Sequence, residues 1–401
     1  MGKKGVNRRD FMKSTVAGMG GFFFLASGDN KPGERIDQGK KKNFPYRTLG
    51  KTGIKLPVIN MGVMNSDNPN LVRAALDAGI VHLDTAQTYQ RGTNETMIGE
   101  LLKERPRDSY VLATKARLPH DQNTGLYTEE ATEEAFQKKI DVSLKNLNLN
   151  YVDIYYHHNV WKKESALFEP IMKALEKAKK AGKTRFVGIT THRNEPEVIQ
   201  AAIDSNFYDV VLTTYNFKQK HYPEVRSAMA KAAQAGLGIV AMKPLGGRQL
   251  QESGQQPIDP VAALKWVLQD PNVHTIIPGF TTFDQMNLDL SVMEDPTLTK
   301  GEKAHLQRGF SMAGLYCQGC GQCLNQCLQR LPIPDLMRAY MYVYGYRNLQ
   351  AAQDLLLSLS LPLYPCGDCS QCSVQCLNRF NIPARVRNVA RLREVPPEFI
   401  G

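Results

Sequence analysis

The chain has 401 residues and a formal net charge of +11. This length exceeds one ordinary core, but it suits a parallel barrel of about 250 residues with an appended module. Much of the excess positive charge lies in the first 42 residues, and no basic patch is interleaved with aromatic residues, so no nucleic-acid partner is expected. No run reaches the roughly 18 apolar residues that a membrane-spanning helix needs.

Residues 1–28 begin with basic side chains and continue into an apolar stretch that glycines interrupt. The segment Arg8–Lys13, two arginines followed by Phe and Lys, resembles a twin-arginine (Tat) export signal; a disordered basic tail is the alternative. This predicts a periplasmic or other extracytoplasmic location. No clear cleavage triplet follows, and an uncleaved segment would associate the chain with the membrane. The polar, lysine-rich residues 29–45 are predicted to be a linker.

Between residues 46 and 300, short apolar runs alternate with amphipathic helical stretches. Eight runs are predicted to be strands: 57–61, 80–83, 110–114, 152–156, 184–189, 210–214, 238–242 and 273–277. Their mostly apolar character is typical of parallel strands that are buried on both faces. Eight strand and helix repeats predict an α/β fold, a closed (β/α)8 TIM barrel, with a doubly wound open sheet as the alternative.

Chemically active side chains follow three successive predicted strands, where a barrel enzyme carries its active site. Asp84 follows the second strand, with Tyr89 in the loop after it, Lys115 follows the third strand, and His158 follows the fourth. A buried lysine needs a partner, so we expect Lys115 to pair with Asp84. The positive charge of Lys115 is expected to lower the pKa of Tyr89, and the Tyr89 phenol could then act as an acid or base. Unrelated salt bridges and a core histidine are the alternative.

With these residues in place, residues 46–290 resemble the aldo/keto reductase family. The segments 46–53 (YRTLGKTG) and 243–247 (KPLGG) add to the likeness. The resemblance implies hydride transfer between a nicotinamide and a small carbonyl or alcohol, a sugar being one candidate. It assigns acid and base chemistry to Tyr89, tuning to Lys115 and Asp84, and orientation of the carbonyl to His158, with His157 as the competing histidine.

The resemblance also implies contacts with NAD(P)(H). The family's Ser-Asn pair after the fifth strand is replaced by threonines, whose hydroxyls can still hydrogen-bond an amide. A family lysine that meets the 2'-phosphate of NADP is replaced by Gly279, so a preference for NADP does not follow. The expected cofactor-binding residues are Gly62, Thr190, Thr191, Pro244, Leu245, Gly246 and Gly247.

All eight cysteines lie after residue 316, in two runs of the form C-x2-C-x2-C-x3-C. This is the ferredoxin-type spacing for two [4Fe-4S] clusters, in which the fourth thiolate of a run can reach the other cluster. Zinc and disulfides are the alternatives. Residues 301–401 are therefore predicted to be a small, mainly helical ferredoxin-like domain, with a helical stretch at 337–361. The expected ligands are Cys317, Cys320, Cys323, Cys327, Cys366, Cys369, Cys372 and Cys376.

Three functions remain open from the sequence. In the first, an exported oxidoreductase holds a bound nicotinamide, and its clusters exchange electrons with a partner protein. In the second, the same enzyme uses its clusters only as structural elements. In the third, a barrel with an altered nicotinamide pocket serves as an electron-transfer protein docked to a membrane redox partner. An export route for folded proteins suits the first, because thiolates would oxidise outside the cytoplasm before metal insertion.

Overall fold

The structure, a computed structural model, describes residues 44–246, 258–310, 317–362, 364–367, 369 and 371–400. The predicted export signal and nearly all of the predicted linker lie outside these residues. Residues 42–401 form one compact unit.

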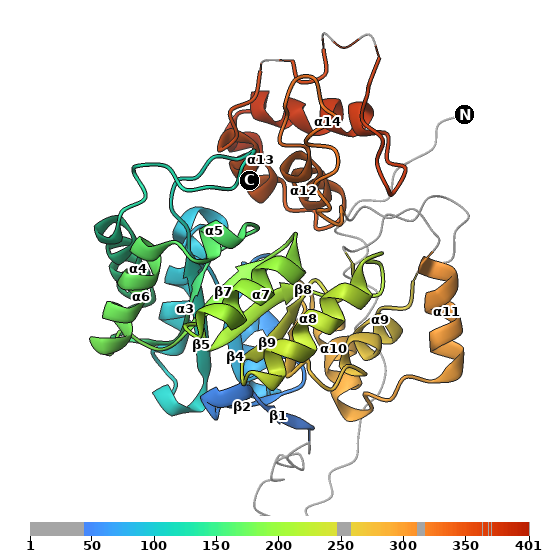
Figure 1. Cartoon of the computed structure of the whole chain (residues 1–401). Coiled ribbons are helices and arrows are strands. Elements are labelled where there is room, and N and C mark those ends of the chain that lie inside the picture. Colours follow the sequence, from blue (N-terminus) through green and yellow to red (C-terminus); the bar gives the residue numbers. More distant parts are fainter. Residues whose placement is uncertain are drawn as a thin grey trace, which may run out of the picture. The chain divides into compact units, whose positions relative to one another are not determined.

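Eight parallel strands form the centre of this unit (Figure 1). The strands pair in chain order, and the last strand lies beside the start of the first, which closes the barrel. The backbone amide of Asn60 donates to the carbonyl oxygen of Ile276 (2.8 Å), and the backbone amide of Ile276 donates to the carbonyl oxygen of Val58 (2.9 Å). The predicted closed barrel is therefore confirmed, and the open sheet is excluded. The strands are β3 (Met61–Gly62), β4 (His82–Asp84), β5 (Val111–Ala116), β6 (Val152–His157), β7 (Thr184–Thr191), β8 (Val210–Thr214), β9 (Gly238–Met242) and β10 (Thr275–Ile277).

An antiparallel hairpin precedes the barrel and belongs to its amino-terminal end. It consists of β1 (Tyr46–Thr48) and β2 (Lys55–Pro57), joined by the 3-10 turn η1 (Gly50–Thr52). Leu49 beside this turn is fully buried and packs into the barrel interior. The predicted first strand, 57–61, therefore divides between the end of β2 and the start of β3.

Helices surround the barrel on its outer side (Figure 1). In α4 (Glu133–Leu147) the hydroxyl of Thr132 caps the first turn by accepting from the amide of Ala135, and Asn148 ends the helix with φ at 52°. The buried face of α4 is Phe136, Ile140, Leu144 and Leu147, as the periodicity predicts. The other helices of this layer are α2 (Pro69–Asp77), α3 (Thr93–Leu102), α5 (Lys163–Ala166), α6 (Glu169–Lys180), α7 (Glu195–Ser205), α8 (Tyr222–Gln234), α9 (Pro260–Leu268) and α10 (Phe283–Glu294).

The helix α11 (Lys300–Phe310) still packs on the barrel, since its Leu306 shares a buried cluster with Ala262 of α9. The cysteine-containing part begins after it and has a core of its own, which includes Leu336 and Val386. Its helices are α12 (Ile333–Tyr344), α13 (Leu349–Leu357) and α14 (Ile382–Ala390), followed by the 3-10 turns η4 (Arg391–Glu394) and η5 (Pro397–Phe399). None of the helices in the described part of the chain has the length and hydropathy needed to cross a membrane.

Polar contacts attach α13 and the residue before it to the carboxyl ends of the barrel strands. Arg91, in the loop after β4, forms an ion pair with Asp354 of α13 (2.8 Å). The amide of Asn348 donates to Asn65, in the loop after β3 (2.9 Å). These contacts place helices of the cysteine-containing part over the end of the barrel where a TIM barrel carries its active site.

Candidate active site

A buried ion pair joins the ends of β4 and β5. The Nζ of Lys115 donates to Oδ1 of Asp84 and, at 2.7 Å, to the carbonyl oxygen of Thr85. The two side chains of the pair are only 3% and 4% exposed, so the interaction is shielded from water. Burial lowers the pKa of Lys115, and the neighbouring Asp84 carboxylate opposes this shift. The pair that the sequence predicts is present.

Tyr89 begins the short 3-10 turn η2 (Tyr89–Gly92), and the Nζ of Lys115 lies 4.9 Å from the centroid of its ring. Burial first, and then the Asp84 carboxylate, raises the pKa of Tyr89 well above its ordinary value. The expectation of a lowered Tyr89 pKa is therefore wrong for this structure, because burial of the phenol, which raises the pKa, is the largest effect. Tyr89 is a neutral phenol, and thus a proton donor, at any pH below about 10.

His158 lies directly after β6, and its ring meets that of Tyr89 edge to face, with 6.4 Å between the centroids. Burial first, and then the charge of Lys115, lowers the pKa of His158 well below its ordinary value. The imidazole is therefore neutral, and its Nδ1 is buried without a hydrogen-bond partner among the described residues. His157 lies elsewhere, with its Nδ1 3.1 Å from the hydroxyl of Tyr208. Of the two histidines, only His158 lines the cavity described next.

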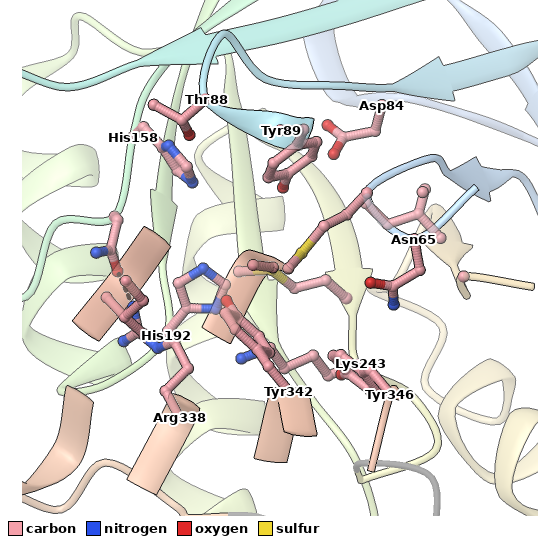
Figure 2. A pocket seen from close by; sticks show the side chains of 18 of the residues that line it. Asn65, Asp84, Thr88, Tyr89, His158, His192, Lys243, Arg338, Tyr342 and Tyr346 are labelled. Atoms are coloured by element: carbon pink, nitrogen blue, oxygen red, sulfur yellow. Dashed lines mark hydrogen bonds between the residues drawn. The ribbon is translucent and has the colours of Figure 1, made fainter. Parts of the chain in front are cut away.

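Tyr89, Asp84 and His158 line one cavity of about 320 Å³ at the carboxyl ends of the strands. Figure 2 shows them on one side of this cavity, with side chains of α12 and its following loop on the other. The second side includes Arg338, Tyr342 and Tyr346. The walls between the two sides include Gly62, Met64, Arg117, Asn159, His192, Met242, Lys243, Pro244, Leu245, Ile277, Pro278 and Gly279.

His192 also lines the cavity, although it is not among the site residues expected from the sequence. It follows β7, and its ring centroid lies 6.5 Å from that of His158. Burial lowers its pKa well below the ordinary value, so this imidazole is neutral as well. Its position after a strand is the signal that pointed to Asp84, and it could have been found in the same way. Arg338 and Tyr342 have no comparable signal, since they come from a separate helical region.

The predicted nicotinamide contacts divide into two groups. Gly62, Pro244 and Leu245 line the cavity. The hydroxyls of Thr190 and Thr191 are engaged elsewhere: the first accepts from the amide of Asn159 (2.7 Å), and the second donates to the carbonyl oxygen of Arg193 (2.8 Å).

The remaining expected nicotinamide-binding residues are two glycines, Gly246 and Gly247. Gly246 has a positive φ of 66°, and a Cβ there would meet the Lys218 side chain at 3.0 Å, so this loop needs glycine. Gly247 lies outside the described residues.

The eight cysteines are all free thiols, and electrostatic interactions divide them into two sets. Burial first, and then the neighbouring thiols of Cys320 and Cys376, raises the pKa of Cys317 to about 11. The pKa of Cys323 is raised to about 12 by burial and by the same neighbours together with Cys317. The first three cysteines of one run therefore lie close to the last cysteine of the other.

The second set combines the first three cysteines of the second run with the last cysteine of the first run. Burial first, and then the thiols of Cys327, Cys369 and Cys372, raises the pKa of Cys366 to about 11. These four residues line a second cavity of about 270 Å³. Within the described ranges, no three His, Cys, Asp or Glu side chains are close enough to share one metal ion.

Comparison with known proteins gives matches over the barrel. A profile described as the aldo/keto reductase family matches residues 60–262, about half of the chain. The L-glyceraldehyde 3-phosphate reductase of Escherichia coli K12 is 25% identical over 323 residues, which cover 66% of this chain and 91% of that protein. The L-galactose dehydrogenase of Arabidopsis thaliana is 30% identical over 224 residues, 52% of this chain and 67% of that one. Both matches leave much of the chain uncovered.

Solved structures agree on the fold. An aldo-keto reductase of Bacillus halodurans in its holo form superposes with a TM-score of 0.55 at 23% identity, covering 66% of this chain and 96% of that one. A thermostable aldo-keto reductase in complex with the inhibitor epalrestat gives a TM-score of 0.53 at 21% identity, covering 66% and 99%. At these sequence identities the likeness concerns the fold alone, and the match covers nearly the whole length of both solved structures.

Proposed function

The chain belongs to the aldo/keto reductase family and is an oxidoreductase, and we propose that it interconverts a small carbonyl compound and its alcohol with a bound nicotinamide. The observation that carries this proposal is the meeting of Tyr89, the Lys115–Asp84 pair and His158 around one cavity. Tyr89 provides a proton donor, the Lys115–Asp84 pair provides a fixed positive charge, and His158 provides a neutral imidazole, all at neighbouring strand ends.

The proton comes from Tyr89 in this proposal. Its raised pKa keeps the phenol protonated at neutral pH, so it can donate to a carbonyl oxygen that becomes an alkoxide-like centre during reduction. Lys115 stands over the Tyr89 ring and stabilises negative charge that develops on the phenol oxygen. Asp84 holds Lys115 in that position, since it accepts the hydrogen bond from Nζ.

His158 orients the carbonyl. Its pKa is lowered, so the ring is neutral and can hold a carbonyl oxygen by a hydrogen bond without transferring a proton. A nicotinamide, when bound, supplies or accepts the hydride at the carbonyl carbon. The residues present fit such a group, because Gly62 and Gly279 line the cavity and put no side chain into it. His192 lines the same cavity and offers a neutral polar group for the carboxamide.

A sugar or a short sugar derivative is the substrate class that the relatives support. The names of similar proteins include an L-glyceraldehyde 3-phosphate reductase, an L-galactose dehydrogenase and a D-threo-aldose 1-dehydrogenase. The cavity of about 320 Å³ suits a molecule of this size next to the reactive end of a cofactor.

We further propose that the cysteines hold two [4Fe-4S] clusters. The crossed grouping supports this, because three thiols of one run with the fourth of the other is the ligand set of a two-cluster ferredoxin. The cavity beside Cys366 offers the space that such a group requires.

Electron transfer between the clusters and the barrel is supported by one close approach. A small cavity of about 20 Å³ is lined by Cys317 and also by His192, Lys243 and Arg338, which line the large cavity too. The set that contains Cys317 is thus the one nearer to the active site. Each cluster carries one electron, so passing the two electrons of a hydride to two clusters would also release a proton, and a partner protein would be the external one-electron donor or acceptor.

Export through the twin-arginine route completes the proposal. The predicted signal, residues 1–28, is of the type that carries folded proteins with their cofactors in place. We therefore propose a periplasmic or other extracytoplasmic location, with a nicotinamide that travels tightly bound. An uncleaved signal would keep the chain at the membrane, near a redox partner.

The test begins with the full chain purified without oxygen. Iron and sulfide are assayed, small molecules released by denaturation are identified by mass spectrometry, and aldehydes and sugars are offered with NADH or NADPH. About eight irons per chain, a bound or acquired nicotinamide and carbonyl turnover support the proposal. Iron without nicotinamide binding or turnover would favour an electron-transfer protein. If the chain kept its full turnover after iron was removed, the clusters would have a structural role and no role in electron transfer.

A further inference from the structure

Two arginines from distant parts of the sequence meet at one wall of the large cavity. Arg117 follows the end of β5, and Arg338 comes from α12. In the amide orientation that satisfies both groups, the oxygen of Asn159 accepts a hydrogen bond from each guanidinium at 3.3 Å. Two cations therefore converge on one neutral acceptor, which does not compensate their charge.

Carboxylates supply little compensation at this wall. Within the described residues, Asp335 is the one carboxylate at ion-pair distance from Arg338 (3.6 Å), and it is shared with Arg193 (3.1 Å). No carboxylate of the described residues lies at ion-pair distance from Arg117. Burial first, and then repulsion from Arg338, lowers the pKa of Arg117, as expected for like charges in a poorly hydrated site.

The other acids that line the cavity are already paired with cations. Asp84 accepts from Lys115, and Asp354 forms its ion pair with Arg91 at 2.8 Å. Neither carboxylate is available to balance the arginines. The wall formed by Arg117 and Arg338 therefore carries an excess of positive charge that faces the space where a substrate would lie.

We propose that Arg117 and Arg338 bind an anionic group of the substrate, a carboxylate or a phosphate that lies a few bonds from its carbonyl. Guanidinium groups match both anions with paired hydrogen bonds. The position suits a short molecule. Arg117 follows Lys115 by two residues, which span roughly 6.5 Å of extended chain, and Asn159 follows His158 directly. The anion site therefore lies only a short distance from the groups that would act on the carbonyl. This proposal rests on the proposed carbonyl chemistry and narrows its substrate class.

A dinucleotide phosphate is the other source of such an anion, and the topology argues against it. The resemblance places the dinucleotide beside the loops after β9 and β10, where Pro244 and Gly279 lie. In the order of the sheet, β5 and β6 are at least three strands away from β9. Arg117 and Asn159 thus stand away from those loops, and Arg338 reaches these two residues from α12, so the point where the two guanidinium groups meet lies on the side of the cavity that belongs to the substrate.

The experiment compares matched pairs of substrates that differ only in charge. Succinic semialdehyde is paired with its methyl ester, and glyceraldehyde 3-phosphate with glyceraldehyde. In the wild-type chain, kcat/KM should favour one or both anionic members by roughly tenfold or more. The variants Arg117→Met and Arg338→Met should lose this preference through a higher KM for the anion, so that the ratio of kcat/KM for the charged and neutral members falls toward one. The variant Arg338→Lys should recover part of it.

Arg105→Met is the matched control, because Arg105 pairs with the surface residue Asp77 and does not line the cavity. Affinity for NADH or NADPH is titrated in every variant. The proposal is overturned if charged and neutral members react equally in the wild type, if Arg117→Met slows both members alike, or if that variant weakens dinucleotide binding instead. Preference for only one of the two anions identifies carboxylate or phosphate as the natural group.

A binding measurement separates this proposal from the carbonyl chemistry. Inorganic phosphate and succinate are titrated into the full chain by calorimetry, without any turnover. Binding that Arg117→Met removes, in a chain that reduces no aldehyde, would support the anion site while the proposed function fails. Absence of binding to both anions, in a chain that reduces neutral aldehydes, would overturn the anion site alone.

Discussion

Arg193 and Asp335 form an ion pair across 3.1 Å, and both side chains are at most 3% exposed. Arg193 follows β7 and also stacks on Trp161 at 3.8 Å, while Asp335 belongs to the first turn of α12. The contact therefore attaches the cysteine-containing part to the barrel through charges that water does not reach.

Replacing Asp335 by Asn should destabilise the chain by about 3–5 kcal/mol, because Arg193 would remain buried without its carboxylate. Chemical denaturation, followed by circular dichroism, measures the change. Glu100→Gln is the control, since its ion pair with Lys103 is exposed and should change the free energy of unfolding by less than about 0.5 kcal/mol. Equal effects of the two variants would contradict the importance of the buried pair.

Replacing Tyr89 by Phe should lower kcat for carbonyl reduction by roughly 100- to 10,000-fold, because the ring stays while the proton donor is lost. Dinucleotide affinity and the visible absorbance of the clusters should not change. Tyr110→Phe serves as the control, since Tyr110 is a buried tyrosine that does not line the cavity. Wild-type turnover in Tyr89→Phe would refute the role of this phenol.

The pH profile of kcat for a neutral substrate should show no loss from His158 or Tyr89 between about pH 6.5 and pH 10. His158 stays neutral above its lowered pKa, and Tyr89 stays protonated below its raised pKa, so neither group titrates in this interval. A neutral substrate is required because burial lowers the pKa of Lys243 to about 7, and an anionic substrate would respond to that charge.

The same profile should change when Asp84 is replaced by Asn. The carboxylate raises the pKa of Tyr89 and balances Lys115, so its removal moves the alkaline loss of activity toward neutral pH. The measurement is the midpoint of that loss in the two proteins. A bell-shaped wild-type profile centred near pH 7 would show that other groups control the chemistry.

Serine substitutions test the crossed cysteine sets. Cys376→Ser and Cys320→Ser should each damage the same cluster, so the double variant should lose no more iron than the more affected single variant. Cys376→Ser combined with Cys372→Ser should damage both clusters and lose more. Iron analysis and electron paramagnetic resonance of the reduced proteins provide the comparison. Additive loss in the first pair, or an unchanged iron content in every variant, would reject the proposed sets.

The barrel and its strand ends could be predicted because both rest on local patterns. Val210–Thr214 and Gly238–Met242 are short apolar runs, and their bounds match β8 and β9. Lys115 and Asp84 follow strands that are neighbours in any closed parallel barrel, so their pairing follows from the order of the strands.

The electrostatics of the cavity could not be predicted in this way. The pKa of Tyr89 depends on how deeply the phenol is buried and on the groups around it, and two of these groups, Tyr342 and Tyr346, come more than 250 residues later in the chain. The roles expected of Thr190 and Thr191 depend on the direction of two hydroxyl groups, which the residue type leaves open.

The cavity is encoded in two separate stretches of sequence, the strand ends of the barrel and the residues between the two cysteine runs. The first stretch supplies the reacting groups Tyr89, Lys115 and His158, and the second supplies Arg338 and Tyr342 on the facing wall. Substitutions or length changes between Cys327 and Cys366 can therefore alter which molecule is accepted while the reacting groups stay intact. Exchange of this segment alone would be a direct route to new selectivity on an unchanged catalytic barrel.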